Sequence, residues 1–324
     1  MTRTPPSFQV NAEEAGRTLS ALLRGPREGI PADSSWNQVK TWCQRGKVQV
    51  DGTTCLDPAR RMVEGERVSL HVDAPRHTPG RIGIVYVDAD VVVVNKPSDM
   101  LSVPVRGSDP DSLVERAAAI LARREKRRPR ALEVVHRIDR GTSGLLLFAR
   151  TAEARRLLEE QFAEHTTERS YRALAQGDAH SATHHTWLME DRGDGLRGSW
   201  GVFRLENSDP PANTREAKTV VEKLERLRGA TLVRCTLSTG RQHQIRIHLS
   251  EAGTPLVGEA VYIRDYVGPR QGAPRVMLHA ASLGFTHPTS GERLRFEAPD
   301  PEDFATLLRR LRGKARSPHE GPST

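Results

Sequence analysis

The 324-residue chain has few cysteines, few aromatic residues and no long apolar run. Its three cysteines, Cys43, Cys55 and Cys235, lie far apart and form no CxxC pair, which argues against a zinc site or a disulfide framework. No segment approaches the roughly 18 consecutive apolar residues that a membrane span requires, and the N-terminus carries no apolar stretch like that of a secretion signal. We therefore expect a soluble, cytoplasmic protein with reduced thiols and no bound metal.

Aromatic residues make up only 5% of the chain, which argues against a binding surface built mainly from stacked rings. The charge is more informative, because 49 Lys and Arg against 41 Asp and Glu give a net charge of +8. A basic balance favours a polyanionic partner, since the release of counterions from phosphates drives association. A generally basic proteome composition is the alternative explanation.

The hydrophobic pattern divides the chain into two units. Residues 8–72 form a small basic unit, residues 73–81 a linker, and residues 82–312 a larger unit, whereas residues 1–7 and the tail 313–324 are expected to be disordered. In the small unit we expect helices at 18–24 and 36–43, the second capped by Ser34 or Ser35, and strands at 47–52 and 67–72. Strands dominate the larger unit, which predicts an α+β fold with a mixed, mostly antiparallel sheet rather than a βαβ series.

The segment with the most chemistry is His136-Arg137-Ile138-Asp139, which lies between two apolar runs. A loop flanked by buried strands fixes its side chains rigidly while exposing their polar heads. A structural loop with a solvated Arg–Asp pair is the alternative. The catalytic loop of protein kinases is excluded, because the order of residues differs and neither a Gly-rich phosphate loop nor Asp-Phe-Gly is present.

A second segment joins a strand, a Thr-Gly turn and a helix that ends at Gly253. Arg241 and Arg246 near the start of this helix can offer bidentate donors to a carboxylate or phosphate. His243 and His248 are five residues apart and have no acidic ligand beside them, so we interpret them as structural histidines rather than metal ligands.

Three further segments, at 168–175, 275–285 and 123–130, contain residues that are candidates for a functional role. Tyr171 has basic neighbours in a strand candidate at 168–175, and residues 275–285 form a mostly apolar strand. The basic run 123–130 follows an apparent helix at 112–121 and leads towards Asp139. It would contact RNA phosphates or form a solvated loop.

Taken together, these segments resemble the RluA-type pseudouridine synthases, which modify uridines in large-subunit ribosomal RNA and some transfer RNAs. The resemblance covers about residues 82–300. It is carried, in order, by Asn95-Lys96-Pro97, His136-Arg137-Ile138-Asp139 with Thr142-Ser143-Gly144, Gly240-Arg241 with His243-Gln244-Ile245-Arg246, Leu278-His279-Ala280, and Phe285 with His287-Pro288.

The resemblance implies a cofactor-free and metal-free isomerase. Asp139 would be the essential carboxylate, Arg246 would pair with it, and Tyr171 would stack on a uridine base flipped out of the RNA. Arg137 would fill the gap that the flipped base leaves. The remaining substrate-binding residues implied are His136, Arg241 and Leu278, the last as a wall of the pocket.

The first unit is similar to the small S-four-type RNA-binding domain, an α/β module, through the hairpin Arg45 to Gly52. This similarity implies RNA contacts by Arg45 and Lys47, to which the basic run adds Arg127 and Arg128. Trp36 stands where the module usually has Arg. The appended domain favours ribosomal over transfer RNA as substrate, and we expect a monomer.

The larger unit departs from the family pattern at Gln242, at Ser98-Asp99 and at Glu259, which would affect loops near the substrate. Two other functions compete with the synthase. A non-catalytic RNA-binding assembly factor would not require Asp139, Tyr171 and Arg246 together. A glycosidase or nuclease would need a second acidic partner or a cluster of metal ligands, which the motifs lack.

Overall fold

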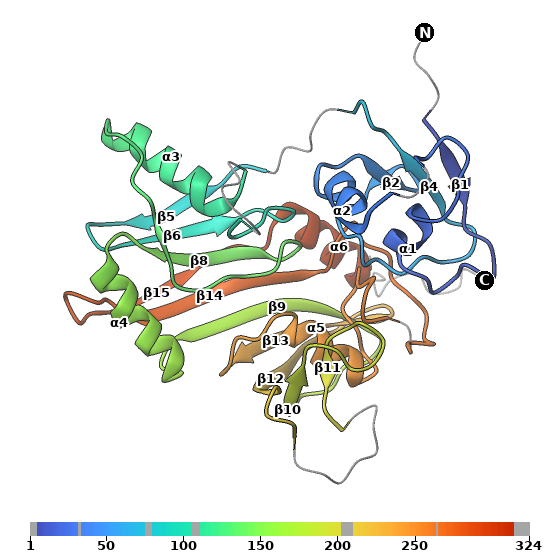
Figure 1. Cartoon of the computed structure of the whole chain (residues 1–324). Helices are drawn as coiled ribbons and strands as arrows, with labels where there is room; N and C mark the ends of the chain where they lie inside the picture. The colour runs from blue at the N-terminus through green and yellow to red at the C-terminus, as the bar shows by residue number, and fades with distance from the viewer. Residues whose placement is uncertain are drawn as a thin grey trace, which may run out of the picture. The chain divides into compact units, whose positions relative to one another are not determined.

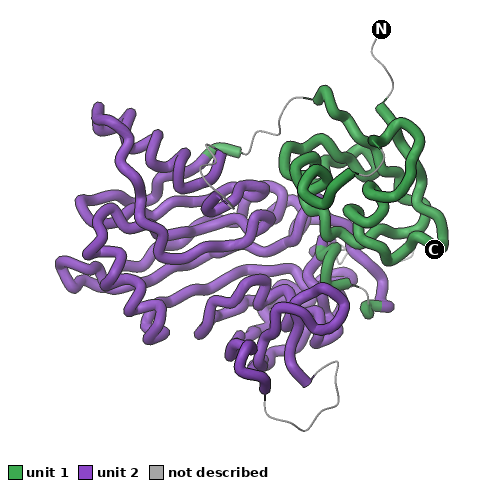
Figure 2. Tube along the Cα trace, in the orientation of Figure 1, with its two compact units in different colours: residues 1–81, 259–266 green, residues 82–258, 267–324 purple. Residues whose placement is uncertain are grey.

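The computed structural model describes residues 5–31, 34–74, 80–104, 111–201, 210–263 and 265–313. The chain divides into two compact units, one of residues 1–81 with 259–266 and one of residues 82–258 with 267–324 (Figure 2). The sequence pattern did not indicate that residues 259–266 belong with the first unit. Residues 1–4, most of the predicted linker and residues 314–324 lie outside the described residues.

The first unit is a four-stranded antiparallel sheet with two short helices (Figure 1). Its elements are β1 (Ser7–Gln9), α1 (Leu19–Leu23), α2 (Trp36–Gln44), β2 (Val48–Val50), β3 (Thr53–Thr54) and β4 (Arg67–Leu70), and the strand order is β1-β4-β2-β3. The predicted helices are present, and Ser35 caps α2 by accepting a hydrogen bond from Gln38 N at 3.2 Å. Ser7 belongs to β1, so the expected disorder of residues 1–7 is wrong at that position.

The second unit is built on one large mixed sheet. Its strands are β5 (Gly83–Val87), β6 (Val91–Lys96), β7 (Glu133–Val134), β8 (Ser143–Ala149), β9 (Glu168–Gln176), β10 (Ala182–Met189), β11 (Gly198–Ser199), β12 (Arg215–Arg226), β13 (Ala230–Leu237), β14 (Leu278–Thr286) and β15 (Arg293–Glu297). The order is β11-β10-β12-β13-β9-β14-β8-β6-β5, with β15 paired to β14 and β7 to β8. Among the described strand pairs only β14 and β8 run parallel, which confirms the predicted α+β fold with a mostly antiparallel sheet.

Strand β8 shows why the middle of this sheet is stable. All seven of its residues are buried, because alternate side chains enter two different cores. Leu146 and Phe148 pack with residues of α3 (Leu113–Glu125), whereas Leu145 and Leu147 pack with residues of α4 (Ala152–Ala163). The two helices therefore cover opposite faces (Figure 1).

The two remaining helices of the second unit are α5 (Gln244–Glu251) and α6 (Glu302–Arg312). The central order β13-β9-β14-β8 brings together the ends of segments that are distant in the sequence. The loop with Asp139 enters β8, Tyr171 lies in β9, Leu278 begins β14, and α5 follows β13. In the part of the chain that the structure describes, no helix is long and apolar enough to cross a membrane.

Candidate active site

A cavity of about 520 Å³ opens in the second unit where these four segments meet. Every residue that the sequence predicted to be catalytic or substrate-binding lines it: His136, Arg137, Asp139, Tyr171, Arg241, Arg246 and Leu278. Their individual roles remain predictions, as does the ion pair between Asp139 and Arg246. Arg246 is buried, while the Asp139 side chain keeps 19% of its surface exposed and can meet a substrate.

The backbone around Asp139 is held from both sides. Ser102 is buried and its hydroxyl donates to Ile138 O at 2.7 Å and accepts from Ile138 N at 3.2 Å. On the other side, Lys96 Nζ donates to Arg140 O at 3.1 Å. Since both neighbours of Asp139 are fixed through main-chain atoms, its carboxylate is positioned without relying on a long flexible side chain.

Lys96 is fully buried at the end of β6, which explains the lysine of the Asn-Lys-Pro segment. Its ammonium group also donates to Pro97 O at 3.0 Å and Met100 O at 2.9 Å, so three backbone carbonyls receive its hydrogens. Burial lowers the pKa of Lys96 to about 7, and the charges of Asp99 and Asp139 oppose that shift.

The segment Thr142-Ser143-Gly144 turns the loop into β8. The Ser143 hydroxyl hydrogen-bonds with His279 Nδ1 at 3.0 Å and accepts from Arg275 Nη2 at 3.2 Å. Gly144 has φ of +114°, and a Cβ there would lie 2.3 Å from Ala280 O. The parallel contact of β8 with β14 therefore requires glycine at this position.

Arg169 and Tyr171 are two residues apart in β9, so their side chains point to the same face of the sheet. Both line the cavity. Tyr171 is 7% exposed, and burial raises the pKa of its hydroxyl to about 12. Arg169 was not among the predicted site residues. The period of two along the strand was the signal that could have found it.

His136 lines the cavity as a neutral side chain. Its Nε2 accepts a hydrogen bond from Leu147 N at 3.0 Å, which places the ring proton on Nδ1, and its ring stacks on Phe162 at a centroid distance of 4.7 Å. Burial lowers the pKa of His136 to about 3, and the charge of Arg169 adds to that shift. His136 is therefore a hydrogen-bonding group rather than a cation at neutral pH.

The start of α5 and the turn before it supply another part of the cavity wall. Gln244 orders this turn, because its Oε1 accepts from Thr239 Oγ1 at 2.7 Å and from Arg241 N at 3.0 Å. His243 lines the cavity, with Nε2 3.9 Å from Asp139 Oδ1, a position that the sequence did not predict; its interpretation as a structural histidine rather than a metal ligand stays a prediction. His248 is structural as predicted, since its two ring nitrogens hydrogen-bond to Thr219 and Thr186 at 2.9 Å each.

The predicted RNA-contacting residues lie outside this cavity. Arg45 is exposed, whereas Lys47 donates its amino group to Ala74 O and both line a shallow hollow of the first unit. In the second unit α3 continues to Glu125, past its predicted end at Leu121, so the basic run begins within the helix. Arg127 and Arg128 follow it on the surface, Arg127 with an ion pair to Glu125 at 3.1 Å.

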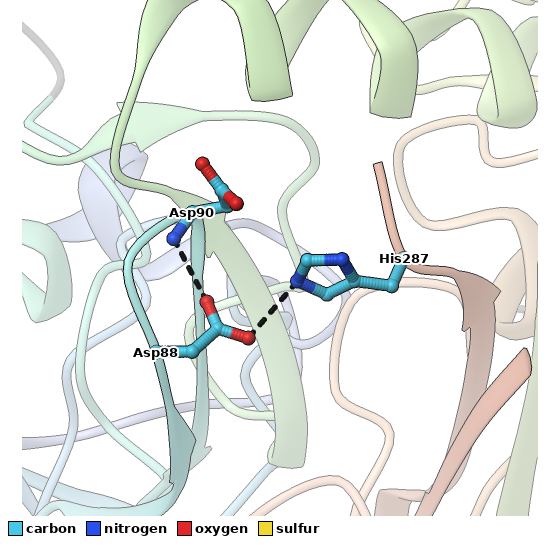
Figure 3. A group of neighbouring side chains, drawn as sticks. All are labelled: Asp88, Asp90 and His287. Carbon is cyan, nitrogen blue, oxygen red and sulfur yellow. Dashed lines mark hydrogen bonds and ion pairs between the residues drawn. The ribbon is translucent and has the colours of Figure 1, made fainter. Parts of the chain in front are cut away.

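One group of side chains has the composition of a metal site, namely Asp88, Asp90 and His287 (Figure 3). Its ligand atoms are already used within the protein. Asp88 accepts from Asp90 N and Val91 N at 2.8 Å each and hydrogen-bonds with His287 Nε2 at 2.9 Å. We therefore interpret the group as a set of structural hydrogen bonds that joins the turn before β6 to the residue after β14.

The departures from the family pattern have local explanations. Asp99 adopts φ of +65°, the left-handed conformation that a glycine usually supplies. Glu259 Oε1 accepts from the backbone nitrogens of Ala260, Val261 and Tyr262 at 2.9–3.2 Å and so orders that turn. Gln242 is exposed and does not line the cavity.

The cavity lining contains four arginines and a single carboxylate, beside a buried tyrosine. This composition suits an anionic, ring-containing substrate such as a nucleotide and lacks the second carboxylate of a typical glycosidase. A protein-family model described as RNA pseudouridylate synthase matches residues 90–251, which include the loop of Asp139, Tyr171 and α5. The chain belongs to this family and is a pseudouridine synthase.

Curated relatives agree over nearly the whole chain. Ribosomal large subunit pseudouridine synthase D of Neisseria meningitidis is 33% identical over 94% of this chain and 82% of that protein. Ribosomal large subunit pseudouridine synthase C of Escherichia coli is 32% identical over 94% of this chain and 95% of that protein. The uncharacterized RNA pseudouridine synthase YlyB of Bacillus subtilis is 36% identical over 86% and 90%.

Two solved human structures share the fold. Human RNA pseudouridylate synthase domain containing 4 superposes with a TM-score of 0.56 at 23% identity, covering 71% of this chain and 93% of that one. Human RNA pseudouridylate synthase domain containing 1 gives a TM-score of 0.52 at 25% identity, covering 74% and 98%.

Proposed function

We propose that this synthase isomerises specific uridines of large-subunit ribosomal RNA, with Asp139 as its catalytic carboxylate. The observation that carries the assignment of Asp139 is its place as the one carboxylate lining a cavity otherwise rich in arginine. The choice of ribosomal RNA is supported by the names of the synthase D and synthase C relatives, which match 94% of the chain. Transfer RNA is the alternative substrate.

Asp139 either attacks the anomeric carbon of the target ribose or removes a neighbouring sugar proton, and in both routes uracil leaves. The detached ring turns and rejoins the ribose through its fifth carbon. Arg246 pairs with Asp139 and orients it, Tyr171 stacks on the base, and Leu278 limits the pocket. His136 Nε2 accepts from Leu147 N, so the ring proton that His136 can donate is the one on Nδ1.

Basic side chains outside the deep cavity hold the RNA. Arg137 and Arg241 line the cavity and are exposed. Arg137 fills the gap that the flipped base leaves in the RNA, and Arg241 contacts the RNA beside it. Arg45, Lys47, Arg127 and Arg128 contact phosphates further away. The protein works in the cytoplasm as a monomer.

The test uses the purified chain and transcripts of large-subunit ribosomal RNA, with a transfer RNA pool as the alternative substrate. We expect the wild type to form pseudouridine in the ribosomal transcript, and Asp139→Asn to bind it but form no product. Asp191→Asn is the matched control, because Asp191 is exposed and accepts hydrogen bonds from Gly193 N and Gly195 N, which Asn can also do. Modification of transfer RNA alone would overturn the assignment of ribosomal RNA, and an active Asp139→Asn would overturn the catalytic assignment.

A further inference from the structure

Arg169 is a buried cation in the wall of the active-site cavity. It lies two residues before Tyr171 on the same face of β9, is 7% exposed, and lines the cavity together with Tyr171. Residues two apart on one face of a strand are roughly 7 Å apart, so a base stacked on Tyr171 would bring one of its edges within reach of the guanidinium.

Few of the hydrogen-bond donors of Arg169 are used. Its Nη2 donates to Ser238 O at 2.9 Å, and its guanidinium lies 5.2 Å from the ring centroid of Phe162. The Nε atom is buried and has no hydrogen-bond partner, and no carboxylate in the described part of the chain pairs with the group. A buried guanidinium without a counter-charge is costly unless a ligand supplies one.

The space beside the guanidinium is kept open by Gly240. A Cβ at position 240 would lie 2.5 Å from Arg169 Nη1, although the backbone of Gly240 needs no left-handed conformation. Gly240 lines the same cavity. Any larger residue there would displace the end of the arginine, so the glycine preserves the position of this donor.

We propose that Arg169 is a further catalytic residue, whose guanidinium donates to a carbonyl oxygen of the uracil ring held against Tyr171. The inference rests on the proposed function of the cavity. Because Arg169 is buried in the cavity wall, a base is a more suitable ligand for its guanidinium than a phosphate of the RNA backbone. Arg137 and Arg241 are exposed and can meet the RNA around the flipped nucleotide, whereas Arg169 is buried in the cavity wall, which favours a base that enters the cavity as its ligand.

The chemistry explains why a cation is needed at this point. When the bond between C1′ and N1 breaks, its electron pair stays on uracil and spreads over N1 and the two carbonyl oxygens. The turned ring uses an electron pair from C5 to form the new bond to C1′; as it forms, either the bond between C1′ and the Asp139 oxygen breaks or the sugar proton that Asp139 removed returns, so Asp139 is regenerated. The proton of C5 is then lost as N1 gains one, so no oxidant or reductant is required. A fixed donor at a ring oxygen stabilises the ring while it carries negative charge.

The experiment compares wild type, Arg169→Met, Arg169→Lys and Gly240→Ala by single-turnover rate and by affinity for two RNAs. One RNA has the target uridine, and the other has an abasic ribose at that position. Arg234→Met is the control, because Arg234 lies on the adjacent strand β13, is exposed and pairs with Glu222 away from the cavity. Urea unfolding of each variant reports whether it is folded.

We expect Arg169→Met to lower the single-turnover rate roughly 100-fold, as loss of one preorganised donor commonly does, and to leave the affinity for abasic RNA within about twofold. Arg169→Lys keeps the charge and should retain an intermediate rate. Gly240→Ala should slow the reaction in the same direction, and Arg234→Met should not.

An unchanged rate in a folded Arg169→Met or Arg169→Lys would overturn the proposal. Equal weakening of both RNAs with an unchanged rate would overturn it in favour of a phosphate contact. Should Arg169→Met not fold, Arg169→Lys and Gly240→Ala decide by the same criteria. A wild type that forms no pseudouridine in ribosomal RNA would instead contradict the proposed function.

Discussion

Single buried side chains outside the cavity hold the backbone on both sides of Asp139. Ser102 fixes Ile138 from one side of Asp139, and Lys96 fixes Arg140 from the other. The His136 side chain, in turn, accepts a hydrogen bond from the main-chain Leu147 N. Because Ser102 and Lys96 act on main-chain atoms, these contacts position Asp139 without occupying its carboxylate.

The neutral state of His136 predicts a pH dependence of stability. Its pKa is lowered in the folded protein to about 3, so the unfolded chain takes up the proton first as the pH falls below 6.5. The contribution of neutral His136 is therefore fully present above pH 6.5 and is lost as the pH falls towards 3. Urea unfolding between pH 7 and 4 should show a steeper loss for wild type than for His136→Gln.

The control for this measurement is His185→Gln, since His185 is an exposed residue whose ring contacts Glu216. It should leave the pH slope near that of wild type. Identical slopes for wild type and His136→Gln would show that His136 is not held neutral.

At the scale of elements, the loop that contains Asp139 is connected to α6 by the buried side chain of Arg275. Arg275 Nη1 donates to Gly141 O at 3.2 Å and its Nη2 to Ser143 Oγ at 3.2 Å. The same guanidinium makes a bidentate contact with Asp303 of α6 at 2.5 and 2.9 Å. The position of the loop therefore depends on α6, although more than 160 residues separate Asp303 from Asp139 in the printed sequence.

We expect Arg275→Met to lower the free energy of unfolding by about 3 kcal/mol, the low end for a broken buried pair, because the Asp303 side chain is 34% exposed. Its single-turnover rate should also fall, since two loop contacts disappear with it. Arg309→Met is the control, because Arg309 lies on α6, as Asp303 does. It breaks an exposed pair with Glu302 and a hydrogen bond to Thr306, and should lower the free energy of unfolding much less than Arg275→Met does. Similar losses in both variants would contradict the role of Arg275.

The sequence predicted those elements whose signals lie within a few neighbouring residues. The loop of Asp139 could be found because polar residues interrupt two apolar strands, and α2 could be found from its cap and period. The end of α3 was placed too early, because its last turn bears Arg123 and Arg124 on the exposed side and the apolar period stops at Leu121.

Contacts between distant segments could not be predicted from local pattern. The parallel pairing of β8 with β14 depends on residues such as Ser143 and His279, which are 136 positions apart. Arg169 and His243 were not predicted to line the cavity, because their neighbours in sequence do not show which side chains meet there in the fold. The assignment of residues 259–266 to the first unit is likewise a tertiary feature.

At the scale of the whole molecule, the net charge of +8 predicts salt-dependent RNA binding. Arg45 and Arg128 are exposed, one in each unit, and neither lines the active-site cavity. Each substitution, Arg45→Ala and Arg128→Ala, should reduce the slope of log affinity against log salt by about one. Single-turnover rates at saturating protein should stay near wild type.

Arg156→Ala is the control for the salt series, because Arg156 is exposed and pairs with Glu153 and Glu160 on its own helix. Its slope should remain that of wild type. Slopes unchanged in both Arg45→Ala and Arg128→Ala would show that these residues do not contact phosphates.

The most direct test of the central claim maps pseudouridine in large-subunit ribosomal RNA from cells that lack this protein. The cells are complemented with wild type or with Asp139→Ala, expressed at equal levels. The account predicts that one or more sites disappear on deletion, that wild type restores them, and that Asp139→Ala restores none. Restoration of every site by Asp139→Ala would contradict the catalytic role of Asp139.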